Sequence, residues 1–130
     1  MKSLIAFTLA AMAAAGYGKP FWDRYDGVSE TDDETIAPVV VLHGLNGDCP
    51  QIAGWVSRIE MEIGSQAVVK CIEIGDGKTT SIFERMDWQV KTVCHKIHND
   101  PDFSGKEISI VGISQGGLIA RSVVEQCEGL

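Results

Sequence analysis

The chain has 130 residues, of which 45% are hydrophobic, 22% are charged and 7% are aromatic. Eleven Lys and Arg residues against eighteen Asp and Glu residues give a formal net charge of -7. An acidic chain without a basic cluster lacks the electrostatic footprint of a nucleic-acid-binding protein and is poorly suited to an anionic membrane surface. The apolar fraction argues against wholesale disorder, and the length fits one small domain.

The first residues have the form of a cleaved secretory signal. Lys2 is positively charged, residues 4–15 are apolar and rich in alanine, and the alanines at 13–15 resemble a cleavage site. The apolar run is well short of the ~20 residues that cross a bilayer, and no later run reaches that length, so no transmembrane segment is predicted. We therefore expect a signal peptide over 1–15, an acidic, turn-rich leader over 16–36 and a domain over 37–130.

Alternating strands and helices are predicted after the leader. The expected strands are 37–43, 67–74 and 107–111, and the expected helices are 52–63, a helix that begins at Ser81 and stops before Asp100-Pro101, and 115–126. Ser81 and Glu84 have the spacing of a capping box, which places the start of the second helix at Ser81. This order predicts a three-layer α/β fold, in which helices cover both faces of a parallel sheet.

Four cysteines are present, Cys49, Cys71, Cys94 and Cys127. An even number in a secreted chain favours two disulfides, and the three possible connectivities remain open on spacing alone. The spacings match no zinc motif, so no metal site is predicted at the cysteines. His95 and His98 lie three residues apart on a predicted helix but have no third ligand at a suitable spacing, so we interpret them as exposed histidines at a helix end.

The motif with the clearest chemical meaning is Gly112-Ile113-Ser114-Gln115-Gly116, because it lies between a predicted strand and a predicted helix. In this context G-x-S-x-G forms a tight elbow that exposes the serine hydroxyl as a nucleophile. The glycines avoid a collision across the elbow, and the N–H of Gln115 can bind an oxyanion at the helix N-terminus. The alternative interpretation is a glycine-rich turn without catalytic meaning.

A second segment supports the interpretation of the G-x-S-x-G motif as a nucleophile elbow. His43-Gly44-Leu45 ends the first predicted strand, where an α/β-hydrolase supplies its other oxyanion donor, and the N–H of Leu45 is the candidate. His43 is a possible base, but we favour a buried histidine that braces the loop.

Several segments together resemble the palmitoyl-protein thioesterases, which are α/β-hydrolases. They are VVVLHG (39–44), EIGDGKT (73–79), QVKTVC (89–94), GISQGG (112–117) and the helix that ends at Cys127. The resemblance covers about residues 38–130. It implies hydrolysis of fatty-acyl thioesters on S-acylated proteins, in the lysosome or outside the cell. Ser114 would be the nucleophile, with Leu45 and Gln115 as oxyanion donors, and no cofactor is predicted. It also implies a Cys94–Cys127 disulfide and leaves Cys49–Cys71 as the second pair.

The rest of a catalytic triad is not found in the expected order. Only sixteen residues follow Ser114, with no His and no Asp among them, whereas the family order is Ser, acid, His. Glu125 would lie about 16 Å further along the same helix, too far to act as the acid. We therefore expect the N-terminal portion of a thioesterase, with an incomplete, three-stranded sheet and no activity by itself. The alternatives are a lipase or carboxylester esterase, and a secreted, non-catalytic fragment that binds lipid or a protein partner.

Overall fold

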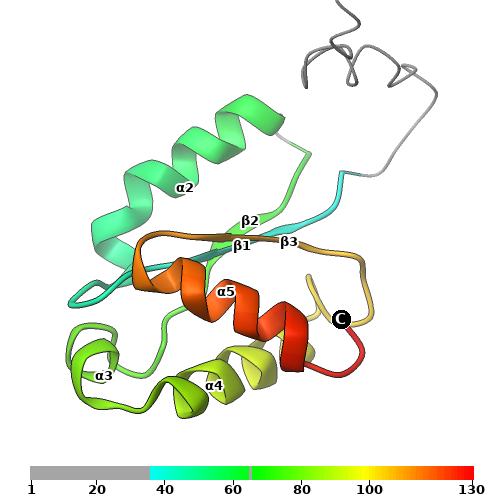
Figure 1. Ribbon diagram of the computed structural model, residues 1–130. Coiled ribbons are helices and arrows are strands. Elements are labelled where there is room, and N and C mark those ends of the chain that lie inside the picture. The colour runs from blue at the N-terminus through cyan, green and yellow to red at the C-terminus, as the bar shows by residue number, and fades with distance from the viewer. Residues whose placement is uncertain (1–35, 65) are drawn as a thin grey trace, which may run out of the picture. The chain divides into compact units, whose positions relative to one another are not determined.

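A computed structural model describes residues 36–64 and 66–130 (Figure 1). The expected signal peptide and nearly all of the expected leader lie outside the described residues. The elements are β1 (Val39–Leu42), α2 (Cys49–Ile63), β2 (Val69–Cys71), α3 (Lys78–Phe83), α4 (Met86–Asn99), β3 (Ser109–Gly112) and α5 (Gln115–Gln126). The predicted alternation is confirmed, with one more helix than expected.

The three strands form one parallel sheet in the order β2-β1-β3. β1 is therefore the central strand, and its pairing places Val41 opposite Cys71 and Leu42 opposite Gly112. In Figure 1, α2 covers one face of the sheet, and α4 and α5 cover the other. An open, three-stranded parallel sheet between two layers of helices agrees with the predicted α/β-hydrolase-like fold.

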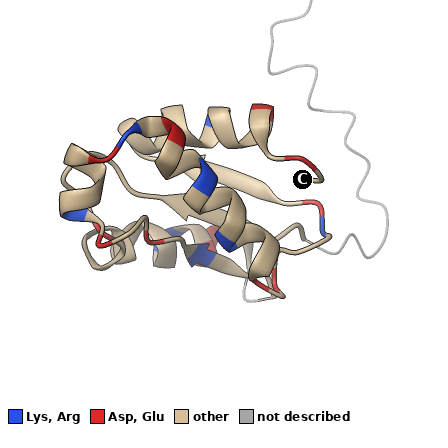
Figure 2. Ribbon diagram, turned by 90° about the horizontal axis from the view of Figure 1, so that it is seen from below, with Lys and Arg blue, Asp and Glu red and all other residues tan. Residues whose placement is uncertain are grey.

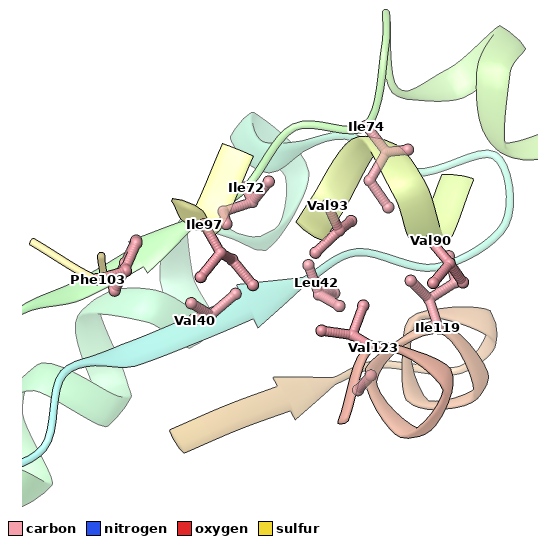
Figure 3. Close-up of a cluster of buried hydrophobic side chains, with 11 residues drawn as sticks. Val40, Leu42, Ile72, Ile74, Val90, Val93, Ile97, Phe103, Ile119 and Val123 are labelled. Carbon is pink, nitrogen blue, oxygen red and sulfur yellow. The ribbon is translucent and has the colours of Figure 1, made fainter. Parts of the chain in front are cut away.

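The arrangement of the core explains why every residue of β1 is apolar. Val40 and Leu42 face α4 and α5 in one cluster, whereas Val39 and Val41 face α2 in a second cluster. Figure 3 shows the first cluster, in which Leu42 lies among Val93, Ile119 and Val123. Full burial of each such side chain is worth about 1.5–3 kcal/mol relative to exposure. Because alternate β1 side chains are buried on opposite faces, none of its four residues is polar.

Charged side chains lie at the periphery of this core. Figure 2 shows Lys and Arg interspersed with Asp and Glu over the helices and the connecting loops. Among the residues that the structure describes, no helix is both long enough and apolar enough to span a bilayer.

The predicted second helix is wrong at its start, because two helices occupy this part of the chain. α3 begins at Lys78 after Gly77, whose φ of 79° suits glycine, and it ends at Phe83, because the following Glu84 is extended. The side chain of Asp76 accepts the N–H of Thr80 at 2.8 Å, which stabilises the first turn of α3. Ser81 therefore lies inside α3 and does not cap a helix. The apolar side chains of Ile82 and Phe83, which follow it, are exposed.

α2 also begins earlier than predicted. Asp48 is its N-cap and accepts the N–H of Gln51 at 2.9 Å, and Pro50 lies in the first turn. Proline is tolerated there because the first N–H groups of a helix have no partner within the helix. The helix predicted over 52–63 therefore starts at Cys49, and only six residues separate the end of β1 from the start of α2.

Candidate active site

Ser114 lies at a sharp turn between β3 and α5. Its backbone has a φ of 55° and a ψ of -121°, a conformation that costs free energy for a residue with a side chain. Only one other non-glycine residue of the described chain, Asn46, has a positive φ. A strained serine between a strand and a helix is the geometry of a nucleophile elbow.

The elbow (residues 112–117) is held by the close approach of backbone atoms. A Cβ on Gly112 would overlap the carbonyl group of Gly116. A Cβ on Gly116 would lie 2.6 Å from the carbonyl oxygen of His43, so the start of α5 packs directly against the end of β1. A side chain at either glycine would therefore collide with backbone atoms across the turn.

The β1–α2 loop (residues 43–48) lies beside the elbow. A Cβ on Gly44 would lie 2.9 Å from the carbonyl oxygen of Ile113 and 3.6 Å from Oγ of Ser114. Neither the N–H of Leu45 nor that of Gln115 has a hydrogen-bond acceptor within the described part of the chain. The structure thus brings Ser114, the candidate nucleophile, and the two candidate oxyanion donors, the N–H groups of Leu45 and Gln115, to one edge of the sheet.

His43 is buried at the end of β1, with only 1% of its surface exposed. Its Nε2 lies 2.7 Å from Oε1 of Glu73 and 3.4 Å from the N of Ile74, and its Nδ1 lies 3.1 Å from the carbonyl oxygen of Gly44. Both ring nitrogens therefore contact groups other than Ser114. This arrangement fits the interpretation of His43 as a brace, and it leaves the imidazole without a nitrogen free to deprotonate the serine.

Glu73 was not singled out as a site residue from the sequence. Its Oε1 contacts His43, and its Oε2 accepts the N–H of Cys49 at 2.9 Å, so one carboxylate links the two ends of the β1–α2 loop. Thirty residues separate Glu73 from His43, and no local pattern predicts such a contact. The only signal in the sequence is an acidic residue near the end of a predicted strand that neighbours β1.

Two further contacts fix the same loop. The Cys49–Cys71 disulfide joins the start of α2 to β2, with 5.7 Å between the Cα atoms. Oδ2 of Asp48 lies 3.2 Å from Nζ of Lys78. The hydrogen bond from the N–H of Gln51 is the main cause that lowers the pKa of Asp48 below its usual value, and Lys78 lowers it further.

The second disulfide lies away from the loop. It joins Cys94 of α4 to Cys127, which follows the last turn of α5. The two bridges are the pairs given by the family resemblance, and no described cysteine is free.

The remaining candidates for acid, base or metal chemistry are the two histidines of α4 and Glu125 of α5. His95 and His98 are exposed on α4, and Nε2 of His98 lies 2.9 Å from the carbonyl oxygen of Glu128. Glu125 pairs with Arg121 one turn earlier in α5. Within residues 36–64 and 66–130, no histidine or carboxylate contacts the hydroxyl of Ser114 by a hydrogen bond, and no group of three acidic, histidine or cysteine residues is arranged to hold a metal ion.

Comparison with known proteins places this geometry in context. The sequence profile of a family described as "Palmitoyl protein thioesterase" matches residues 38–130. A Dictyostelium discoideum protein named palmitoyl-protein thioesterase 3 is 35% identical over 89 residues, which are 68% of this chain and 30% of that protein. A Schizosaccharomyces pombe protein named palmitoyl-protein thioesterase-dolichyl pyrophosphate phosphatase fusion 1 is 29% identical over 113 residues, which are 79% of this chain and 16% of that protein. The chain thus spans less than a third of the length of either relative.

Proposed function

The chain belongs to the palmitoyl protein thioesterase family, and from this premise we propose that Ser114 is the nucleophile of a serine hydrolase that removes fatty-acyl groups from cysteine residues of S-acylated proteins. One observation carries the proposal. The strained Ser114 lies in the elbow beside the β1–α2 loop, and the N–H groups of Gln115 and Leu45 in these two segments have no acceptor within the described residues. Such donors are suited to the negative charge of a tetrahedral intermediate.

The proposed reaction has two steps. Oγ of Ser114 attacks the carbonyl carbon of the thioester, the carbonyl π bond opens onto oxygen, and the serine proton passes to a base. The oxyanion accepts hydrogen bonds from Leu45 and Gln115 until the C–S bond breaks and the cysteine thiolate leaves with a proton. Water then cleaves the acyl-serine and releases the fatty acid. Each N–H group would account for about 10²- to 10³-fold in rate.

Serine is a weak nucleophile unless a base accepts its proton. His43 is bound to Glu73 and to the β1–α2 loop, and the two other histidines lie on α4. We therefore propose that turnover needs a histidine and a carboxylate that residues 36–130 do not supply. The 130-residue chain by itself should then hydrolyse a palmitoyl thioester no faster than its Ser114→Ala variant. Ser114-dependent turnover by this chain would show that a base is present and would contradict the proposal on this point.

A chimera tests the proposed reaction directly. This chain would be joined to the part of the Dictyostelium relative that follows the matched region, and hydrolysis of a palmitoyl-cysteine peptide would be measured. We expect turnover that falls at least about 1,000-fold in Ser114→Ala. A matched peptide with palmitate on serine serves as the oxygen-ester control, and faster cleavage of that peptide would favour the lipase or carboxylester esterase alternative. A folded chimera without Ser114-dependent hydrolysis, beside an active intact relative, would refute the proposal.

We propose that the chain acts in the secretory pathway, as a lysosomal or secreted protein. The signal-like composition of residues 1–15 and the pairing of all four cysteines support this location, because disulfides persist in oxidising compartments. Fractionation of expressing cells tests it. Reduced protein confined to the cytosol would contradict it.

A further inference from the structure

Ser81 lies between the two loops of the active site, although the sequence pattern assigned it to a helix cap. It is in the second half of α3, and only 3% of its surface is exposed. Its hydroxyl contacts the β1–α2 loop and its carbonyl contacts the first residue of α5. The proposed reaction gives Ser81 no role, so its contacts with both segments require an explanation.

The hydroxyl fixes the β1–α2 loop next to the candidate oxyanion donor. Oγ of Ser81 accepts the N–H of Asn46 at 2.8 Å and donates to the carbonyl oxygen of Lys78 at 2.9 Å. The N–H of Asn46 belongs to the peptide unit that directly follows Leu45. Asn46 also has a φ of 53°, a conformation that is uncommon for non-glycine residues. The hydrogen bond from Asn46 to Ser81 therefore holds this positive-φ turn one peptide unit away from the N–H of Leu45.

The carbonyl of Ser81 fixes the elbow in the same way. It accepts a hydrogen bond from Nε2 of Gln115 at 3.0 Å, and the same nitrogen lies 3.3 Å from Oε1 of Gln89. Gln89 is buried and donates to the carbonyl oxygen of Glu84 at 2.9 Å. The side chain of Gln115 is therefore held at its far end by α3 and by buried Gln89. The backbone N–H of the same residue is the second candidate oxyanion donor.

We propose that Ser81 is a positioning residue that sets the spacing and direction of the two oxyanion donors. The inference rests on the proposed function, because the donors matter only if an oxyanion forms at Ser114. Ser81 does not touch the reacting atoms. It acts through Asn46 on one donor and through the side chain of Gln115 on the other, so that both N–H groups point to the same place before substrate arrives. Such preorganisation is the main source of oxyanion stabilisation, because the donors need not reorient during the reaction.

The neighbouring Thr80 offers a matched control. Thr80 is also buried in α3, and its hydroxyl also accepts one hydrogen bond and donates another, but both go to Asp76. Thr80→Val and Ser81→Ala therefore each remove one buried hydroxyl and two hydrogen bonds from adjacent positions. A general weakening of α3 would affect both variants alike, whereas loss of the link to the oxyanion donors would affect only Ser81→Ala.

Amide hydrogen exchange and NMR spectra of the full 130-residue chain test the proposal without any need for catalytic activity. In Ser81→Ala we expect the Asn46 amide to exchange about tenfold faster or more, relative to the amides of α4. We also expect the amide resonances of Leu45 and Gln115 to shift. In Thr80→Val all three amides should keep their wild-type behaviour, although the melting temperature falls by a similar amount. Unchanged Asn46 exchange in Ser81→Ala, or the same changes in both variants, would overturn the proposal. Faster Asn46 exchange without shifts at Leu45 and Gln115 would leave Ser81 with a structural role only and would also overturn it.

Kinetics in the chimera described above separate this inference from the proposed function. Ser81→Ala should lower kcat about tenfold or more and leave KM nearly unchanged, because the donors act on the transition state and not on the bound thioester. Thr80→Val should leave both constants close to wild type. A chimera that is inactive with Ser81 intact would count against the proposed function, while the exchange result would still decide whether Ser81 orders the two donors. Equal losses of kcat in the two variants would refute a specific role for Ser81.

Discussion

The elbow that contains Ser114 and the neighbouring β1–α2 loop are held in place by different means. The elbow is fixed mostly by backbone packing, with no room for a Cβ on Gly112 or Gly116. The β1–α2 loop is fixed mostly by side chains: His43 with Glu73, Asp48 with Lys78, Ser81 with Asn46, and the Cys49–Cys71 disulfide. The elbow should therefore be sensitive to added atoms, and the β1–α2 loop to lost polar groups and to the loss of its disulfide.

The largest effect is expected from one added methyl group in the elbow. In Gly116→Ala the new Cβ would lie about 2.5–2.6 Å from the carbonyl oxygens of Leu42 and His43, so α5 must move away from β1. We expect a loss of about 4 kcal/mol in the free energy of unfolding, measured by urea denaturation. Gly117→Ala is the control, because its Cβ would meet only the carbonyl oxygen of Gly112 at 3.5 Å. That variant should be about 0.5 kcal/mol more stable, since alanine favours the helix. Equal effects would disprove the packing account.

Removal of a disulfide should have the next largest effect on stability. Its local effect should depend on which of the two bridges is lost. The cysteines of the two bridges are 22 and 33 residues apart in sequence, so loss of either bridge should cost about 3 kcal/mol through the unfolded chain. Only Cys49→Ala with Cys71→Ala should also speed amide exchange at Leu45 and Asn46. The matched Cys94→Ala with Cys127→Ala should speed exchange in α4 around residue 94 and at the end of α5. Faster exchange at Leu45 in both double variants would show that the bridges act globally.

Release of backbone strain should give a smaller effect of opposite sign. Ser114→Gly should raise the free energy of unfolding by about 1 kcal/mol, because glycine adopts a φ of 55° without steric cost. Asn46→Gly is the comparison in the β1–α2 loop. It should give no gain, since asparagine already tolerates this region and glycine adds entropy to the unfolded chain. Thermal unfolding measures both, and a destabilised Ser114→Gly would remove the argument for strain at the elbow.

Acid should weaken the β1–α2 loop before the elbow, and this is the smallest effect expected. The pKa of Asp48 lies below its ordinary value of 3.8, chiefly because its carboxylate accepts the N–H of Gln51. A lowered folded-state pKa means that this stabilisation is present above the ordinary value and is lost as the pH falls through the folded-state pKa. The melting temperature of the wild type should therefore fall more steeply below about pH 4 than that of Asp48→Asn. No matching effect is expected at the elbow, because α5 has no acidic residue in its first turn. Parallel curves for the two proteins would contradict this assignment.

Local patterns predicted the parts of the molecule that depend on local chemistry. The apolar run of β1, the turn at Ser114 and the crowding at Gly112 and Gly116 all follow from neighbouring residues. Ser81 was misassigned because the capping-box spacing to Glu84 is also local. In the folded chain its hydroxyl binds Asn46, 35 residues away, and the helix starts after Gly77. The contact of Glu73 with His43 also joins residues far apart in sequence. The contacts that hold the site in place could therefore be found only from the structure.

The pairing of β1 with β3 also determines when the site can form during folding. The two strands join residues seventy positions apart, such as Val39 with Ser109, whereas β1 and β2 join residues only thirty apart. Parallel pairing over a long loop is slow, because the entropy of loop closure is lost before the contacts compensate for it. A refolding chain that has only the β1–β2 pair has no elbow beside Leu45. We therefore expect the candidate oxyanion donors to come together late in folding, and amide protection at Ser109–Gly112 should report this step.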